Sequence, residues 1–199
     1  MPLLLLCAGA ASAADAIDVF GMHWTVPLAS EWKVEDDGGT AALRIVTHRG
    51  PDKDKPRRPQ QFALSEKEYG SFQMDADVKA VTKSLIIVYA YKDEAHFNYA
   101  HLSTDTGAKQ PVHNGIFHVF GGERVRISST EGPPSFAAMD QWNHISLRYD
   151  AKAGKLAVLV NGNANPSVTA VDLSLGSGKV GLGSFDETAV FKNVKIVTK

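Results

Sequence analysis

Two histidines are the side chains of this sequence whose types and spacing best fit acid–base chemistry. His101 follows Tyr99 by two residues in an alternating stretch, so both side chains are expected on one face of a strand. We expect His113 and Asn114 to open the strand that follows the next turn. An imidazole titrates near neutral pH and can take or give a proton at a carbon or hydroxyl of a substrate. We predict that His101 and His113 are acid–base residues and that Asn114 contacts the substrate.

Three tyrosines close to these histidines are candidate binding residues. Tyr89 and Tyr91 lie in the apolar stretch before Tyr99, and we expect them to line the neighbouring strand. A tyrosine ring offers an apolar face and a polar tip, which together suit a sugar ring. The sequence therefore predicts a carbohydrate ligand. An alternative remains open, in which histidines on a solvent-facing strand have no chemical task.

Two acidic turns are options for calcium. Asp186 and Glu187 lie in one turn and Asp36 and Asp37 in another, and carboxylate oxygens are the ligands that calcium prefers. Neither turn reproduces an EF-hand loop. Catalytic zinc needs three convergent ligands, and the histidine spacing defines no such set. The identity of any metal stays open.

The elements that must position these residues are strands. In residues 72–79 apolar side chains alternate with polar ones, which is typical of a half-buried strand. Residues 84–92 are apolar almost throughout, as in a central strand, and no stretch predicts an amphipathic helix. Further strands are expected over residues 96–104, 115–120, 124–129, 143–150, 156–160, 180–182 and 190–197. Roughly a dozen short strands joined by turns predict an all-β sandwich of two antiparallel sheets.

The length and charge of the chain restrict its class. It has 199 residues, of which 44% are hydrophobic, and a formal net charge of −1. This length fits one domain with one substantial core. The near-neutral charge provides no basic surplus for a phosphate backbone, so we expect no nucleic-acid partner. The oligomeric state stays open.

The N-terminal residues resemble a targeting segment. An apolar run over residues 3–10 leads into Ala11-Ser12-Ala13, the small-residue pattern of a signal-peptide cleavage site, although no basic residue precedes it. We expect a signal peptide at residues 1–14, a domain over residues 15–199, and a secreted or periplasmic location. The run is too short for a membrane span. Cys7, the single cysteine, lies within it, so the mature domain would contain no disulfide.

One loop interrupts the pattern of strands. Residues 49–59 include three prolines and no hydrophobic side chain other than these. A loop of this length inside a compact domain is usually functional or disordered. Two interpretations remain open. The segment is either a solvent-exposed loop without a function, or a lid that carries Arg57 or Arg58 to the rim of a binding face.

Several blocks over residues 30–199 resemble, in order, the concanavalin A-like lectin/glucanase superfamily. Within it they are most similar to secreted domains of the 3-keto-disaccharide hydrolase group, which is glycoside-hydrolase-16-like and LamG-like. The matching blocks are WKVEDDGG at 32–39, RRP at 57–59, FAL at 62–64, YGSF at 69–72, YKDEAHFNYAHL at 91–102, HNGIF at 113–117, WNHI at 142–145, VNG at 160–162, GKVGLGSFDET at 178–188 and FKNV at 191–194. The resemblance implies a jelly-roll sandwich that binds a glycoside on a concave sheet.

The resemblance also implies site residues. It points to His101, His113 and Arg124, with Arg58 on the long loop. A planar guanidinium at Arg124 or Arg58 can stabilise an enolate or orient hydroxyl groups. The alternative for Arg124 is a simple ion pair with an acid.

The paired acids of the glycanase members are missing. Their E-x-D-x-x-E strand supplies two carboxylates on one face, and the nearest equivalent here is Asp75-x-Asp77 without either glutamate. We therefore do not expect ordinary glycanase catalysis. Because the superfamily contains enzymes and lectins, two functions stay open: a 3-keto-glycoside-cleaving enzyme, or a non-catalytic carbohydrate-binding or surface-interaction module.

Overall fold

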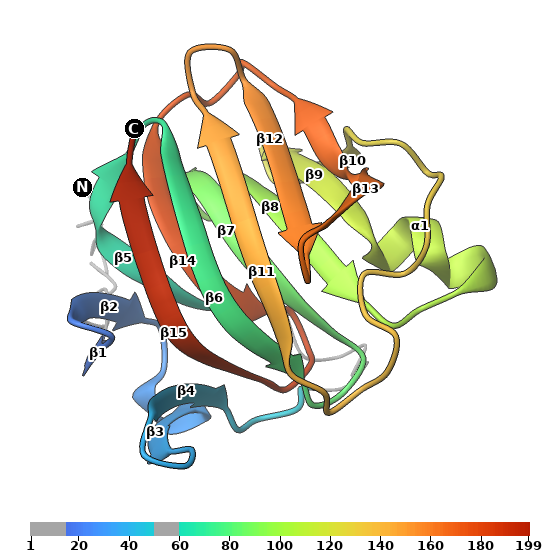
Figure 1. Cartoon of the computed structure of the whole chain (residues 1–199). Helices are drawn as coiled ribbons and strands as arrows, with labels where there is room; N and C mark the ends of the chain where they lie inside the picture. Colours follow the sequence, from blue (N-terminus) through green and yellow to red (C-terminus); the bar gives the residue numbers. More distant parts are fainter. Residues whose placement is uncertain (1–14, 50–59) are drawn as a thin grey trace, which may run out of the picture.

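Two antiparallel β-sheets packed face to face account for most of the chain (Figure 1). The computed structural model describes residues 15–49 and 60–199. The strands are β1 (Asp15–Val19), β2 (Met22–Val26), β3 (Trp32–Asp36), β4 (Ala41–Ile45), β5 (Gln61–Tyr69), β6 (Phe72–Ala80), β7 (Ser84–Asp93), β8 (His96–Ser103), β9 (Gly115–Phe120), β10 (Glu123–Arg126), β11 (Asn143–Asp150), β12 (Lys155–Val160), β13 (Asn163–Val171), β14 (Gly178–Ser184) and β15 (Ala189–Thr198). The short helices are η1 (Ala29–Glu31), η2 (Gly107–Lys109) and α1 (Gln110–His113).

The topology confirms the predicted jelly-roll sandwich. The eight-stranded sheet has the order β1-β2-β5-β14-β7-β8-β9-β10, and the seven-stranded sheet has the order β13-β12-β11-β6-β15-β4-β3. Strands distant in sequence become neighbours, as β14 does between β5 and β7. The strands predicted over residues 72–79 and 84–92 correspond to β6 and β7.

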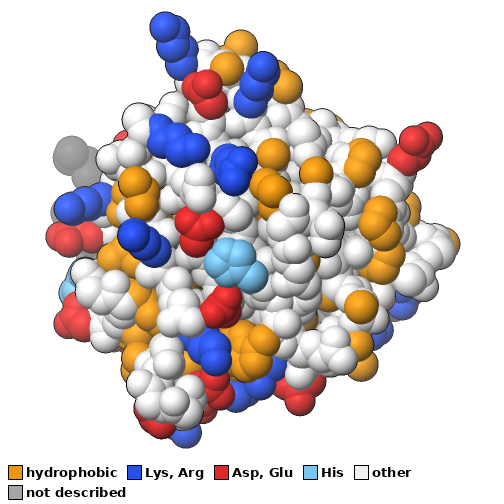
Figure 2. Space-filling view, viewed as in Figure 1, with side chains coloured by type: hydrophobic (Ala, Val, Ile, Leu, Met, Phe, Trp, Pro, Cys, Tyr) orange, Lys and Arg blue, Asp and Glu red, His pale blue; other side chains and the backbone are white. Residues whose placement is uncertain are grey.

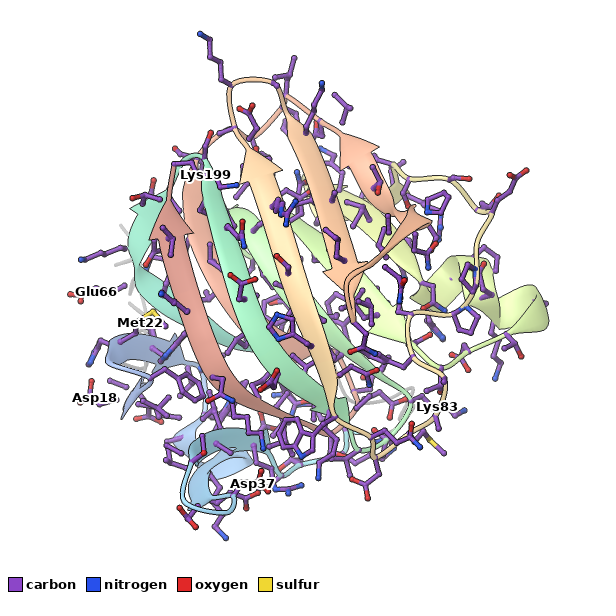
Figure 3. The ribbon with its side chains drawn as sticks, viewed as in Figure 1. Asp18, Met22, Asp37, Glu66, Lys83 and Lys199 are labelled. Atoms are coloured by element: carbon purple, nitrogen blue, oxygen red, sulfur yellow. The ribbon has the colours of Figure 1, made fainter. Side chains whose placement is uncertain are left out.

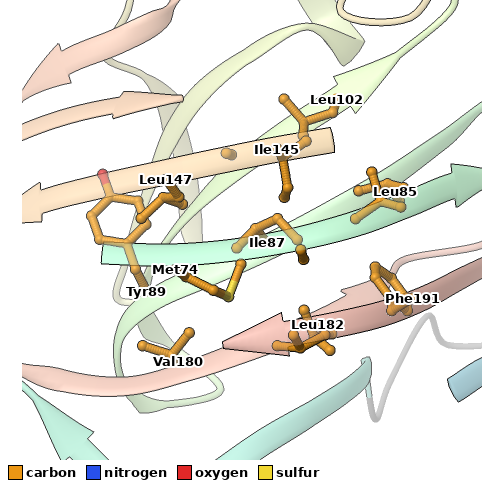
Figure 4. Packing of buried hydrophobic residues seen from close by; sticks show 14 of the residues in the cluster. Met74, Leu85, Ile87, Tyr89, Leu102, Ile145, Leu147, Val180, Leu182 and Phe191 are labelled. Carbon is orange, nitrogen blue, oxygen red and sulfur yellow. The ribbon is translucent and has the colours of Figure 1, made fainter. Parts of the chain in front are cut away.

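The main core lies between the sheets. Alternate residues of β6, from Phe72 to Ala80, are buried, and the residues between them are partly exposed. Figure 4 shows Met74 of β6 packed among Ile87, Leu147 and Leu182 from other strands. The two-residue period of the sequence therefore translates directly into one buried and one solvated face.

A second apolar cluster covers the other face of the eight-stranded sheet. Its members come from β5, β7, β8 and β9, and they are Phe62, Ile86, Val88, Phe97, Tyr99, Phe117 and Val119. On β14, Gly183 leaves room for this cluster, since a Cβ there would lie 2.7 Å from Cδ1 of Phe62. Strands β7 and β8 are thus packed on both faces, which gives the side chains at their ends a rigid support.

The solvent face of the seven-stranded sheet is polar. Figure 2 shows charged side chains gathered over it, with a histidine between acidic side chains. Asp75 and Asp77 share this face, as the sequence predicted, and Oδ1 of Asp77 lies 2.9 Å from Nδ1 of His144. Asn193 donates a 2.6 Å hydrogen bond to the other oxygen of Asp77. The two carboxylates therefore belong to a surface network.

Two predicted elements differ from the structure. The strand expected over residues 124–129 ends at Arg126. His113 does not open a strand but is the last residue of α1, and the strand begins at Gly115. Pro111 at the start of α1 favours a helical turn there, because its fixed φ fits the first helical positions. The predicted signal peptide and Arg58 lie outside the described residues. Within the described part of the chain, no helix has the length and apolar character needed to cross a membrane.

Candidate functional site

A cavity of about 590 Å³ opens at one end of the eight-stranded sheet. Figure 3 labels Lys83, one of its lining residues, in the turn between β6 and β7. The residues around it are His48, Val81, Thr82, Lys83, Ser84, His101, His113, Arg124, Met139, Ser184, Phe185, Asp186 and Glu187. The cavity thus brings together three predicted site residues, His101, His113 and Arg124.

His101 is the buried histidine of this pocket. It lies on β8 with only 6% of its surface exposed, and its Nε2 lies 3.0 Å from Oγ of Ser84. Its Nδ1 makes no hydrogen bond to any described residue. Burial, followed by the nearby His113 and the charge of Arg124, holds the pKa of His101 well below its ordinary value of 6.5. His101 is therefore neutral at pH 7.

His113 packs against His101 at the wall of the pocket. The two ring centroids are 5.1 Å apart. Nδ1 of His113 lies 2.5 Å from Oδ2 of Asp105, whose side chain is 13% exposed. Of these two neighbouring histidines, His113 thus has a carboxylate partner and His101 has none among the described residues.

Arg124 forms the positively charged wall. Its guanidinium carbon lies 3.9 Å from the ring centroid of Phe117, and Nη2 donates a 2.6 Å hydrogen bond to the carbonyl of Val112. The cation therefore rests on an aromatic face while contacting the turn that carries His113.

Arg126, two residues further along β10, holds the same turn. Its guanidinium donates to the carbonyl oxygens of Pro111, Asn114, Ser128 and Ser129. Burial and the charge of Arg124 lower the pKa of Arg126. Two arginines of β10 thus fix α1, and with it the backbone of His113.

The opposite wall of the pocket is acidic. Asp186 and Glu187 lie in the turn between β14 and β15, and Oε2 of Glu187 is 3.5 Å from Nδ1 of His48. The backbone N–H of Arg49 donates a 2.9 Å hydrogen bond to the carbonyl of Asp186, and its side chain pairs with Glu31 at 2.6 Å. Carboxylates accept hydrogen bonds from hydroxyl groups, whereas the facing guanidinium can only donate.

The three predicted binding tyrosines do not line the pocket. Tyr89 lies in the core between the sheets, where Figure 4 shows it beside Leu147. Tyr99 is completely buried and stacked on Phe117 at 5.2 Å. Tyr91 packs against Phe97 on the outer face. The aromatic ring in the pocket is instead that of Phe185.

A backbone irregularity separates Tyr89 from Tyr91. Residues two apart on a regular strand share a face, but Ala90 has a φ of +50° and the pairing of β7 with β8 shifts register between Tyr89 and Asp93. The bulge directs one tyrosine inward and the other outward.

Asn114 also lies outside the pocket. Its Oδ1 accepts hydrogen bonds from the N–H groups of Ser103 and Ser135, at 3.0 and 2.8 Å. Its Nδ2 donates to Oγ of Ser103 and to the carbonyl of Asp105, at 2.8 and 3.1 Å. Since all these groups are satisfied within the protein, Asn114 organises the backbone rather than offering a substrate contact.

The acidic turns considered for calcium already have protein partners. Asp37, labelled in Figure 3, lies 2.5 Å from Nζ of Lys192, and this hydrogen bond lowers the pKa of Asp37. Among residues 15–49 and 60–199, no group of three or more His, Cys, Asp or Glu side chains is arranged to hold a metal ion.

Several pocket residues escaped the sequence analysis. Asp105 lies in a loop without any period, so nothing in the sequence connected it with His113. Phe185 had a signal, because it continues the two-residue spacing of Gly181 and Gly183 along the outer face. His48 precedes the segment outside the described residues, and its approach to Glu187 depends on tertiary structure.

Comparisons with solved structures agree with this fold. Carbohydrate-binding module CBM66 from Bacillus subtilis superposes with a TM-score of 0.61 at 16% identity, over 88% of this chain and 95% of that one. A putative glycosyl hydrolase from Parabacteroides distasonis gives a TM-score of 0.55 at 14% identity, over 85% and 83%. A second putative glycosyl hydrolase from the same organism gives 0.53 at 17% identity, over 86% and 92%. At these identities the likeness concerns the fold.

The sequence comparisons define the family. No curated protein matches the chain in sequence. The family model of the 3-keto-alpha-glucoside-1,2-lyase-like domain matches residues 19–197, which include every strand from β2 to β14 and every described residue that lines the pocket. The chain therefore belongs to the carbohydrate-active family of 3-keto-alpha-glucoside-1,2-lyase-like domains.

Proposed function

We propose that this domain cleaves 3-keto-α-glucosides in the pocket at the end of the eight-stranded sheet. The observation that carries the proposal is the convergence of His101, His113 and Arg124 around one cavity of about 590 Å³. The family name supplies the substrate class. An arginine and two histidines of unequal environment are suited to proton abstraction beside a ketone.

The reaction is an elimination. A ketone at carbon 3 acidifies the hydrogen on carbon 2, and a base removes this proton to form an enolate. The enolate electrons then form the double bond between carbons 1 and 2, the bond from carbon 1 to the glycosidic oxygen breaks, and the leaving oxygen takes a proton from water. Later addition of water to the double bond gives the overall outcome of a hydrolysis.

The role of each residue follows from its charge. His113, paired with Asp105, is the base for carbon 2. Arg124 carries the permanent positive charge that stabilises the developing negative charge on the carbon 3 oxygen. His101 is neutral and lines the same cavity, so it packs beside His113 without competing for the proton.

Residues on the other walls of the pocket bind the sugar. Asp186 and Glu187 can accept hydrogen bonds from hydroxyl groups of the substrate. Phe185 offers an apolar ring at the same rim, and an aromatic ring can pack against the C–H groups of a sugar.

Turnover of p-nitrophenyl 3-keto-α-glucoside tests the proposal, with nitrophenolate release as the readout. His113→Gln should lower kcat by about 10²–10⁴-fold, the usual contribution of a positioned base. His144→Gln is the matched control, because His144 forms a comparable carboxylate pair on the seven-stranded sheet, and its kcat should not change. Saturable binding without any release would replace the enzyme by the non-catalytic binding module.

A further inference from the structure

We infer that Asp105 is the positioning residue of this pocket, holding the ring of His113 in one orientation and one tautomer with Nε2 presented to the substrate. The effect of Asp105 on turnover rests on the proposed function. The effect of Asp105 on the tautomer of His113 is independent of that function.

The contact between the two side chains defines the tautomer. An ionised carboxylate only accepts hydrogen bonds, so the ring nitrogen beside it must carry a hydrogen. Nδ1 of His113 lies 2.5 Å from Oδ2 of Asp105, which makes Nδ1 the protonated nitrogen. In the neutral ring the lone pair then belongs to Nε2, the nitrogen that a base needs.

Among the described residues this pair combines a shielded carboxylate with the shortest histidine–carboxylate distance. Asp172, beside His118, is similarly shielded, with 15% of its side chain exposed against 13% for Asp105, but its Oδ2 lies 3.4 Å from Nδ1 of His118, whereas the His113–Asp105 distance is 2.5 Å. A shielded carboxylate is less screened by water and orients its partner more strongly.

Asp105 is itself held by a buried polar network. Its backbone N–H donates a 3.0 Å hydrogen bond to Oγ of Ser103, and its carbonyl accepts one of 3.1 Å from Nδ2 of Asn114. Asn114 and Ser103 are fully buried and hydrogen-bonded to each other. The network explains why these polar residues occupy the junction of β8, α1 and β9, since it fixes the loop that carries Asp105.

Charged and titratable side chains from several elements surround His113. His101 faces it from β8 and Arg124 from β10, and Lys83 lines the same cavity from the β6–β7 turn. His48, Asp186 and Glu187 lie on the opposite wall. Asp105 contacts the ring directly, so it stabilises the imidazolium that forms when His113 takes a proton in the presence of Arg124.

Nitrogen-15 NMR of the histidine rings tests the inference without any substrate. In the wild-type protein at a pH where the ring is neutral, the His113 signals should report hydrogen on Nδ1. Asp105→Ala should transfer that hydrogen toward Nε2. Asp93→Ala is the matched control, because Asp93 pairs with His96 at 2.9 Å outside the pocket, and it should leave the His113 signals unchanged.

Kinetics with p-nitrophenyl 3-keto-α-glucoside provide the second readout. Asp105→Ala should lower kcat about 10²-fold with little change in KM. We expect less than the about 10⁴-fold loss known for the orienting aspartate of serine proteases, because the side chain of His113 is 36% exposed and water can replace part of the contact. Asp105→Asn keeps the shape of the side chain and serves if the alanine variant does not fold. It should also lower kcat, because the amide carries no negative charge.

The results of the two experiments distinguish the role of Asp105 from the proposed function. Hydrogen on Nε2 of His113 in the wild-type protein would overturn the inference, as would unchanged His113 signals in Asp105→Ala. A wild-type protein that releases no nitrophenolate would refute the proposed function, while the NMR result would still decide the role of Asp105.

Discussion

Replacing Arg126 should loosen the turn that carries His113. The guanidinium of Arg126 donates hydrogen bonds to the carbonyl oxygens of Pro111, Asn114, Ser128 and Ser129, and the bond to Asn114 measures 2.6 Å. Alanine removes all four bonds. Lysine keeps the charge, but its ammonium is a point donor that cannot serve four carbonyls arranged around a planar fork.

The expected loss of stability depends on how well each of the four carbonyl oxygens is shielded from water. A hydrogen bond to a charged group contributes about 1.5–3 kcal/mol net. Ser129 is exposed, and water can replace its bond, as it can in part for the half-buried Ser128. The bonds to Pro111 and Asn114 belong to the better protected turn, so we expect Arg126→Ala to lower the free energy of unfolding by about 3 kcal/mol. For a domain of this size the loss corresponds to about 6–12 °C in Tm.

Thermal unfolding followed by circular dichroism measures the effect. Arg126→Lys should recover less than half of the loss, and Arg148→Ala, on the polar face of β11, should change Tm little. Because His113 moves with the turn, kcat for the keto-glucoside should fall as well, since misplacement by about 1 Å can cost 10²-fold. A Tm of Arg126→Ala within about 2 °C of the wild type would refute this reasoning.

Two further predictions concern stability. The pKa of His101 is held below its ordinary value of 6.5, so below that pH the unfolded chain binds more protons than the folded chain. The free energy of unfolding should therefore fall by up to about 1.4 kcal/mol per pH unit as the pH drops below about 6.5. Urea titrations at about pH 7.5 and pH 5.5 should show a smaller loss in His101→Gln, and equal losses in both proteins would contradict the assignment. Gly183→Ala should cost about 1–3 kcal/mol, because its Cβ would lie 2.2 Å from the carbonyl oxygen of Gln61. Gly70→Ala is the control, since nothing lies within 4 Å of a Cβ there. Equal Tm values for the two variants would contradict the prediction, because they would mean that β5 and β14 move apart enough to accept the methyl group.

The strand architecture could be predicted because it depends on local periodicity. The alternation in β6 and the continuous apolar run of β7 distinguish a half-buried strand from a central one, and the structure confirms both. The grouping of His101 with His113 and Arg124 was also anticipated. The two histidines were expected from their residue type and spacing, whereas Arg124 was added by the resemblance to a family, because local periodicity does not indicate which distant residues meet.

The structure differs from the sequence-based expectations where the backbone departs from regularity. The positive φ of Ala90 separates Tyr89 from Tyr91, and no local pattern announces such a bulge. The helical turn at α1 rotates His113 away from the strand expected there. Asp105 reaches His113 through a folded loop, and Asn114, which was expected to contact the substrate, is buried and hydrogen-bonded to the backbone. These contacts depend on tertiary structure, so sequence spacing alone could not predict them.

The structure of the first product tests the central claim most directly. The wild-type protein would be incubated with p-nitrophenyl 3-keto-α-glucoside deuterated at carbon 2, and the earliest sugar product would be examined by mass spectrometry and proton NMR. Elimination predicts a product lighter than the free keto-sugar by one water, with the deuterium lost and a double bond between carbons 1 and 2. An initial product that is the free keto-sugar, with the deuterium retained and a solvent oxygen on carbon 1, would contradict the account.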